Sequence, residues 1–273
     1  MFGPARHRSA SVYELLGEQN NLGEHTRYIN LGYWKNANTY DKACEALVDL
    51  VGQWADIKPH HRVLDVGCGF GEQDVRWLQQ YTPQQLTAIN ITPLHIEKAR
   101  ERFQNPDRFT HPALDFQLAS ATDLPFARHS FDRIVGLESA FHFNTRRDFF
   151  REAMRVLKPG GTLTLADTVP LKNPENAWDS AKYWLMGGLW QVPLCNYYNL
   201  DTYQHHLHLA GFTDIITEDI SAHVWAPFKE FAQQRVQDTE IRARVHPLLR
   251  KIWGTPHKAA EQIQYVLISA TKP

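Results

Sequence analysis

The feature that most constrains this sequence is the run VLDVGCGFGEQ (63–73), in which a branched apolar stretch leads through three alternating glycines into the start of a helix. Short apolar runs that end in glycine are typical of buried strands. Because glycine has no Cβ, the turn at Gly67, Gly69 and Gly71 can be sharp and can approach a ligand closely, next to the free N–H groups of a helix N-terminus. The run predicts a strand followed by a ligand-binding turn or, on the plainer interpretation, by an ordinary tight connection.

Strand and helix patterns alternate around this run, which predicts an α/β fold with a doubly wound, mostly parallel sheet. We expect strands at 62–66, 85–91, 114–120, 131–139 and 162–167, and helices at 40–54, 70–80, 93–100 and 147–157. After Asp167 the alternation stops. An aromatic-rich stretch without a clear period covers 171–200, and it is followed by an expected helix (201–210), strand (212–219), helical stretch (226–252) and final strand (263–270).

Charge and composition exclude several classes of partner. The formal net charge is -1 and no long basic run is present, which argues against nucleic acid and against anionic membrane surfaces. The sequence has no stretch of about 18 apolar residues, and its first residues lack the apolar core of a signal peptide. Cys44, Cys68 and Cys195 are widely spaced and odd in number, which fits a reducing compartment. We expect a cytoplasmic protein without a membrane span.

The glycine pattern also bears on the cofactor. A dinucleotide fingerprint would place its third glycine one residue later and an acidic residue about 20 positions further on. Here Asn90 stands where that acid would be expected. A nicotinamide-dependent oxidoreductase is therefore the weaker hypothesis, and a cofactor-binding protein without turnover is a further alternative.

Three motifs in fixed order resemble class I S-adenosylmethionine-dependent methyltransferases: VLDVGCGFG (63–71), LPF with SFD (124–132) and RVLKPGGTLTLAD (155–167). YINLGYW (28–34), SATDLPF (120–126), LESAFH (137–142) and the closing YVLISATKP are similar to small-molecule enzymes of the erythromycin O-methyltransferase type and, more distantly, to sterol, tocopherol and cyclopropane-type methyltransferases. The resemblance covers nearly the whole chain from residue 12. It implies S-adenosyl-L-methionine as cofactor, S-adenosyl-L-homocysteine as product, and a seven-stranded Rossmann-like sheet in the order 3-2-1-4-5-7-6 with an antiparallel last strand.

The resemblance also implies a division of the chain. Residues 1–58 would form an N-terminal helical lid, and residues 59–273 the methyltransferase domain, with a cap insertion after strand 5 at about 171–200 and a helical insertion at about 223–258. Aromatic residues crowd the segment 178–198, and Gly187-Gly188 is a candidate hinge. These aromatics favour a bulky, apolar acceptor, although they would equally suit the contact of a homodimer.

Cofactor contacts are carried over from the resemblance by position. Gly67, Cys68 and Gly69 would back the methionine part, and Asn90 with Ile91 would meet the ribose. The other expected contacts are Ser120 and Ala121 at the adenine, Leu137 at the start of LESAFH, and the aromatic lid residues Tyr28, Tyr33 and Trp34. Aromatic faces attract a sulfonium cation, but each of the three could instead pack in the core. Asn90 and Ser120 replace acids that are common in the family, which puts cofactor affinity rather than cofactor identity in doubt.

The catalytic hypothesis rests on LESAFHFN (137–144), which begins where strand 4 ends and so lies on the rim of the expected crevice. By the resemblance, His142 would be the general base for an acceptor hydroxyl, and Asp167, at the end of strand 5, would fix its tautomer. A core histidine is the alternative. Glu138 would contact the cofactor amino group or the surroundings of the base, or would only cap the next segment. The run HHLH (205–208) lacks the ligands that would complete a metal site, so no metal is expected.

The predicted function is methyl transfer from S-adenosylmethionine to a small, largely apolar metabolite, most simply at a hydroxyl. Carbon methylation of an alkene or prenyl chain, including a prenyl diphosphate, is the alternative within the family.

Overall fold

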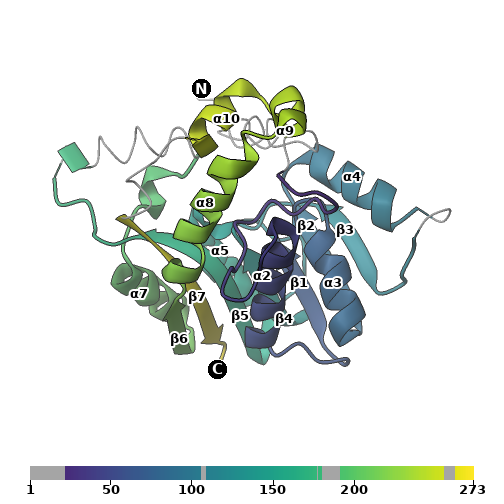
Figure 1. The fold of residues 1–273 in the computed structure, drawn as a ribbon. Coiled ribbons are helices and arrows are strands. Elements are labelled where there is room, and N and C mark those ends of the chain that lie inside the picture. Colours follow the sequence, from purple (N-terminus) through teal and green to yellow (C-terminus); the bar gives the residue numbers. More distant parts are fainter. Residues whose placement is uncertain (1–21, 106–108, 177, 180–190, 255–261) are drawn as a thin grey trace, which may run out of the picture.

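A seven-stranded sheet forms the centre of the computed structural model, which describes residues 22–105, 109–176, 178–179, 191–254 and 262–273 (Figure 1). The strands are β1 (Arg62–Val66), β2 (Gln85–Asn90), β3 (Leu114–Leu118), β4 (Phe131–Leu137), β5 (Leu157–Pro170), β6 (Thr213–Asp219) and β7 (Ile263–Thr271). The longer helices are α2 (Tyr40–Trp54), α3 (Glu72–Tyr81), α4 (Pro93–Phe103), α5 (Arg146–Val156), α7 (Leu200–Ala210), α8 (Trp225–Arg235), α9 (Thr239–Arg244) and α10 (Pro247–Gly254).

The strand order is β3-β2-β1-β4-β5-β7-β6, which confirms the predicted order. β1 pairs in parallel with β2 and β4, and β4 pairs in parallel with β5. β7 runs antiparallel to both of its neighbours, β5 and β6. The carboxyl ends of β1, β2, β3, β4 and β5 therefore lie along one edge of the sheet, where the crevice of a doubly wound fold opens.

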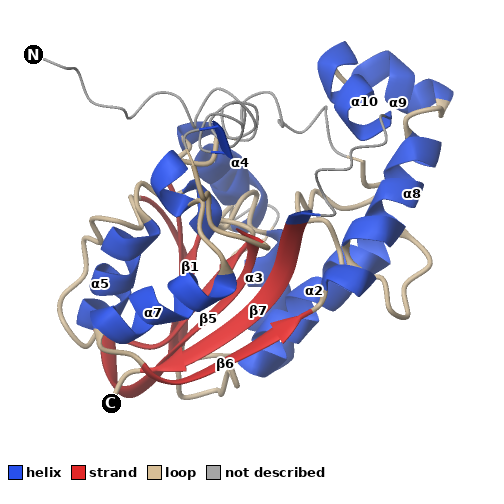
Figure 2. Ribbon diagram, turned by 90° about the vertical axis from the view of Figure 1, so that its left-hand side faces the viewer, coloured by secondary structure: helices blue, strands red, loops and turns tan. Residues whose placement is uncertain are grey.

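Helices cover both faces of the sheet and enclose two apolar clusters (Figures 1 and 2). On one face, α2, α3 and α4 pack on the strands through side chains such as Val51, Trp77 and Ile96. On the other face, α5 and α7 do so through Phe149 and Leu207, among others. Because both faces are buried, β1 reads as a nearly continuous apolar run, as the sequence pattern predicted.

Several element bounds differ from the sequence prediction. β5 begins at Leu157 and not at Thr162, because residues 158–161 are themselves hydrogen-bonded to the end of the chain segment after β7. The N–H of Gly160 donates to the carbonyl of Lys272, and the N–H of Lys272 donates to the carbonyl of Gly161. The expected helical stretch 226–252 is three helices, since Asp238 caps the start of α9 and Pro247 opens α10. The helix that begins at Pro93 continues to Phe103.

Within the expected N-terminal lid, the helix predicted at 40–54 is present as α2, whereas residues 22–39 are irregular. Several of their backbone N–H groups donate to distant acceptors and not to carbonyls four residues earlier: those of Tyr33 and Trp34 donate to the carbonyls of Ala43 and His223 (both 2.8 Å). The N–H of Arg27 donates to Glu72 (3.0 Å), and that of Leu31 donates to Glu138 (2.7 Å). Gly32 adopts φ +78°, which a helix does not allow. This segment is therefore fixed by long-range contacts.

Much of the expected cap, including Gly187-Gly188, lies outside the described residues. Its last part, 191–199, is described and contains a 3-10 turn, Leu194–Asn196, directly before α7. Within the described ranges, none of the helices has the length and apolar character required to cross a membrane.

Candidate active site

The turn after β1 brings bare backbone to the edge of the sheet. Gly67, Gly69 and Gly71 all have positive φ (98°, 55° and 84°), a conformation that glycine adopts without strain. The N–H groups of Gly67 and Cys68 both donate to the carbonyl of Ile89 at the end of β2 (2.8 and 3.1 Å). A Cβ on Gly67 would lie 2.4 Å from the Cβ of Ser139. Glycine is thus required at 67, because the turn after β1 touches the loop after β4.

The predicted ribose contacts lie at the end of the neighbouring strand. The side-chain oxygen of Asn90 accepts from the N–H of Thr92 (3.0 Å), and its nitrogen lies 3.4 Å from Nδ1 of His95. The amide is therefore oriented by its own loop, although its oxygen has a second lone pair for a ligand hydroxyl. Ile91 follows with 47% of its surface exposed, as expected for a residue that borders a ligand rather than the core.

The predicted adenine contacts come after β3, which pairs with β2 through Asn90 and Leu118. Ser120 Oγ lies 3.0 Å from Thr122 Oγ1 and accepts from the N–H of the same residue (3.3 Å). Ala121 is buried. The glycines of the turn after β1, the amide after β2 and the small residues after β3 are chemically suited to the methionine, ribose and adenine parts of S-adenosylmethionine.

Two buried acids beneath the turn were missed by the sequence analysis. Asp65 on β1 and Asp74 on α3 are fully buried and interact with each other, and Gln73 Nε2 donates to Asp65 (2.7 Å). Burial raises the pKa of Asp65 to about 7 and that of Asp74 well above its usual range. At neutral pH the pair therefore retains a proton. An acid inside an apolar strand, as in VLDV, was the available signal.

Glu138 follows β4 and joins distant parts of the chain. A single carboxylate oxygen, Oε1, accepts from the N–H of Leu31 and from the hydroxyl of Tyr265 on β7, each at 2.7 Å. Burial raises the pKa of Glu138 to about 7. The two hydrogen bonds act to lower this pKa, and the nearby charge of Asp167 acts to raise it. Glu138 thus holds the segment 22–34 against the end of β4, a structural role that its predicted catalytic role did not include.

The lid aromatics have packing partners. Trp34 Nε1 donates to the carbonyl of Leu31 (2.9 Å), and its ring lies 5.2 Å from that of Phe231 on α8. Tyr33 meets His223 edge-on at 5.4 Å. Tyr28 is buried in the cluster beneath α2. These contacts support the packing interpretation for Trp34, whose indole is turned toward α8.

His142 ends a 3-10 turn, Ala140–His142, directly after β4, and is half-buried. Its Nδ1 lies 3.3 Å from the carbonyl oxygen of Gln191. A carbonyl only accepts, so Nδ1 carries the proton in this contact and Nε2 carries the lone pair. Burial lowers the pKa of His142 to about 4; the positive charge of Arg146 acts in the same direction, and the hydrogen bond to Gln191 opposes both. The imidazole is therefore neutral at pH 7.

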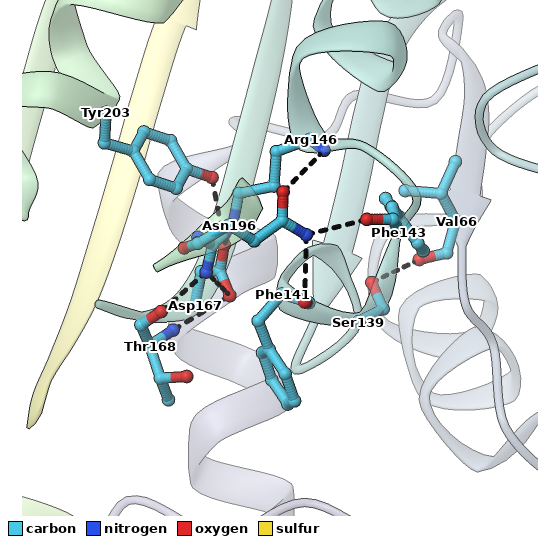
Figure 3. Close-up of polar contacts among 9 residues, drawn as sticks. All are labelled: Val66, Ser139, Phe141, Phe143, Arg146, Asp167, Thr168, Asn196 and Tyr203. Atoms are coloured by element: carbon cyan, nitrogen blue, oxygen red, sulfur yellow. Dashed lines mark hydrogen bonds and ion pairs between the residues drawn. The ribbon is translucent and has the colours of Figure 1, made fainter. Parts of the chain in front are cut away.

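Asp167 does not orient His142, which corrects the predicted pairing; Figure 3 shows the groups that Asp167 contacts instead. Across the described chain, its carboxylate accepts from Arg146 Nε (3.0 Å) and Nη2 (3.3 Å), from the hydroxyl of Tyr203 (3.1 Å) and from the N–H of Thr168 (2.8 Å). The physical reason is the buried guanidinium of Arg146, whose charge needs a buried counter-ion. The backbone of Gln191 supplies the contact to His142 that was assigned to Asp167.

Two side chains that the sequence analysis missed connect these parts (Figure 3). Ser139 Oγ donates to the carbonyl of Val66 (2.6 Å) and so joins the loop after β4 to the end of β1. The side-chain amide of Asn196 donates to the carbonyls of Phe141 (3.1 Å) and Phe143 (2.7 Å), on either side of His142. No pattern in the sequence marks Asn196, because its segment has no periodicity.

Comparisons with known proteins agree with the predicted family and fold. A family model described as "Methyltransferase domain" matches residues 64–165. The chain is 33% identical to erythromycin 3''-O-methyltransferase of Saccharopolyspora erythraea over 97% of its own length and 90% of that protein. It is 30% identical to 27-O-demethylrifamycin SV methyltransferase of Amycolatopsis mediterranei over 90% of each chain. A solved structure of a mycolic acid cyclopropane synthase complexed with SAH shares the fold, with a TM-score of 0.80 at 18% identity and 99% coverage of both chains.

Proposed function

This chain belongs to the class I S-adenosylmethionine-dependent methyltransferases, of the small-molecule type that includes erythromycin 3''-O-methyltransferase, and on that premise we propose that it methylates a hydroxyl of a small, largely apolar metabolite with His142 as the general base. Membership in this family sets aside the nicotinamide-dependent alternative.

The hydrogen bond between His142 and Gln191 is the observation that carries the proposal. Because Nδ1 donates to the carbonyl, the basic lone pair is on Nε2, the nitrogen able to accept a proton from an acceptor. The low pKa keeps the imidazole neutral, and hence able to act as a base, throughout the physiological range. His142 follows β4, which pairs with β1, the strand whose glycine turn we propose to bind the cofactor.

The reaction does not require a strong base. When bound, S-adenosylmethionine supplies a methyl group that its sulfonium has already activated. As the acceptor oxygen forms its bond to the methyl carbon, the carbon–sulfur bond breaks and the hydroxyl proton becomes strongly acidic. His142 Nε2 takes that proton at this point, so even an imidazole with a pKa of about 4 is basic enough. The larger contribution of the chain is to hold the reacting oxygen in line.

The acceptor class is supported by the relatives and by the aromatic content. The names of the two relatives indicate action on erythromycin and on 27-O-demethylrifamycin SV, both by methyl transfer. In the described part of the cap, Tyr197 and Tyr198 lie directly before α7 and are largely buried. The aromatic content predicted for the cap suits a large, mostly apolar molecule with a free hydroxyl.

The test is methyl transfer to a panel of acceptors by the wild-type protein and by His142→Ala. The panel comprises 27-O-demethylrifamycin SV and an erythromycin that lacks its 3''-O-methyl group as alcohols, geranyl diphosphate as an alkene, and phosphoethanolamine as an amine. We expect methylation of an alcohol, and a loss of about 100- to 10,000-fold in kcat for His142→Ala at pH 7.5. His205→Gln, on the exposed side of α7, is the matched control and should keep the wild-type rate.

Retention of alcohol methylation by His142→Ala would remove the base assignment. Turnover of geranyl diphosphate in place of the alcohols would favour carbon methylation, for which the fold shared with a cyclopropane synthase is the supporting observation.

A further inference from the structure

The polypeptide on both sides of His142 is held by one buried side chain, Asn196 (Figure 3). Its Nδ2 donates to the carbonyls of Phe141 (3.1 Å) and Phe143 (2.7 Å), and its Oδ1 accepts from the N–H of Arg146 (3.1 Å). Asn196 is 1% exposed. Both of its donor hydrogens and its acceptor oxygen are thus used on the short stretch that carries His142.

This stretch needs such a partner because it lies between two regular elements. Carbonyls at the end of a 3-10 turn receive no hydrogen bond from the helix that follows. An N–H in the first turn of α5 likewise has no acceptor within the helix. A buried polar group that is left without a hydrogen bond is costly. Asn196 satisfies three of these groups at once, and in doing so it fixes their relative positions.

Asn196 is itself anchored to the sheet. Arg146 Nη1 donates to the backbone carbonyl of Asn196 (2.6 Å), while Nη2 of the same guanidinium donates to the carbonyl of Thr168 on β5 (2.6 Å). The ion pair with Asp167 holds the guanidinium in place. The position of the amide is therefore set by a central strand and not by a mobile surface loop.

The same short segment also contacts the imidazole ring. Gln191, five residues before Asn196 in the sequence, supplies the carbonyl to which His142 Nδ1 donates (3.3 Å). The segment 191–196 therefore holds His142 twice, at the ring through Gln191 and at the backbone through Asn196.

We propose that Asn196 is a positioning residue for methyl transfer: by fixing the backbone on both sides of His142, it keeps the imidazole aligned with the Gln191 carbonyl and Nε2 directed at the acceptor oxygen. This inference rests on the proposed function, since it assigns to Asn196 a role that is exercised through the base. The rival role is fold stability alone, and the two roles differ in what they predict for His142.

The first experiment measures the tautomer of His142 in the absence of any methyl acceptor. Long-range proton–nitrogen spectra of the imidazoles are recorded at pH 7.5 with S-adenosylhomocysteine present, and the His142 signals are assigned by their loss in His142→Gln. We expect the Nδ1–H tautomer in the wild type and a mixture of tautomers in Asn196→Ala. Asn199→Ala is the control: it removes another asparagine that bonds to the backbone shortly after the segment (Thr202 N–H donates to Asn199 Oδ1, 3.1 Å), and should leave the tautomer unchanged.

Asn196→Asp is the second variant, because it keeps an oxygen for the N–H of Arg146, places a charge beside the guanidinium and loses both donated hydrogen bonds. A wild-type tautomer in either Asn196 variant that folds and binds S-adenosylhomocysteine would overturn the proposal. Failure of both variants to fold would assign Asn196 to stability alone and would overturn it equally.

The second experiment uses the alcohol that the wild-type protein methylates. We expect Asn196→Asp to lower kcat by about 100-fold, since a displacement of about 1 Å can cost that much, while the KM for S-adenosylmethionine changes less than about threefold. In a His142→Gln background the same substitution should have less than about a twofold effect, because two residues that act through one step are not additive. A full additional loss in that background would overturn the positioning role.

The two claims fail in different ways. If His142→Gln methylates alcohols at the wild-type rate, the proposed function fails whatever the tautomer measurement shows. If His142→Gln is inactive but the Asn196 variants keep both tautomer and kcat, the positioning role alone fails.

Discussion

The two halves of the site are built in different ways. On the side proposed for the cofactor, at the ends of β1, β2 and β3, glycines and small residues predominate, as in the turn from Gly67 to Gly71. On the side proposed for the acceptor, beside β4 and β5, the polypeptide around His142 is held by the buried side chains of Asn196, Arg146 and Asp167 (Figure 3). The first half depends on glycines that leave room for close backbone contacts, and the second on a connected set of side chains.

This difference shows where each half tolerates change. A backbone surface fails when a Cβ is added, whereas a side-chain network fails when a partner is removed. Four substitutions, with effects expected to decrease from the first to the last, test this difference.

Arg146→Met should have the largest effect on stability. It leaves the fully buried carboxylate of Asp167 without its counter-ion, which costs about 3–5 kcal/mol of unfolding free energy. Urea denaturation at pH 7.5 measures this loss. The control is Glu101→Gln, which breaks the exposed ion pair with Lys98 and should cost less than about 0.5 kcal/mol. A similar loss in the two variants would mean that the buried network does not hold the acceptor side.

Gly67→Ala should disable the cofactor side. Its φ of 98° is strained for alanine, and the added Cβ would lie 2.4 Å from the Cβ of Ser139. We expect binding of S-adenosylhomocysteine, measured by calorimetry, to weaken by about 100-fold. Gly160→Ala is the matched control, because Gly160 also has positive φ (74°) but a Cβ there meets nothing within 4 Å. Equal weakening in both variants would show that backbone strain, and not contact with Ser139, is the cause.

Glu138→Gln should change how stability depends on pH. The pKa of Glu138 rises from its ordinary 4.5 to about 7 on folding, so the folded state holds this proton more tightly than the unfolded state. The resulting stabilisation is fully present below pH 4.5 and is lost as the pH rises through 7. Glutamine cannot ionise, so the decrease in unfolding free energy between pH 5.5 and 8.5 should be smaller in the variant by about 1–2 kcal/mol.

The comparison needs urea denaturation of both proteins at both pH values. Part of the decrease will remain in the variant, because burial raises the pKa of Asp65 in the same direction. An identical decrease in the two proteins would contradict the assignment to Glu138.

Thr145→Ala should have the smallest effect. Thr145 caps α5 directly after the His142 turn: its hydroxyl accepts from the N–H of Asp148 (3.1 Å) and donates to the Asp148 carboxylate (2.9 Å). Loss of this cap should cost about 1 kcal/mol by urea denaturation. Because Asn196 still holds the turn, kcat should change by less than about threefold. A larger fall in kcat would indicate that the cap, too, positions His142.

The same contrast explains what the sequence could predict. The glycine turn and the strand order follow from local patterns and from the family resemblance, because a buried strand and a tight turn each require particular residue types at adjacent positions. The side-chain network does not follow from local patterns. Asn196 and Asp167 are brought together by the folding of segments that are far apart. Asp167 was assigned to His142 because it was expected at the end of the strand beside the one that His142 follows. The two strands, β4 and β5, are neighbours, but β5 continues to Pro170, and adjacency of strands does not show which buried cation pairs with the Asp167 carboxylate.

The N-terminal segment is a second case. The course of residues 22–39 could not be predicted, because Leu31 donates to Glu138, 107 positions away, and contacts of that range leave no signal in a short window of sequence.

The carboxylate of Glu138 has a consequence for the order in which the site can form. One oxygen receives the N–H of Leu31 and the hydroxyl of Tyr265, which are 107 and 127 positions away in the chain in opposite directions. During translation the N-terminal partner is made well before the partner on β7. The glycine turn after β1 can therefore assemble before β7 is made, whereas the junction beside His142 cannot. In a nascent protein of this kind, the turn proposed for the cofactor would form before the junction beside the proposed base.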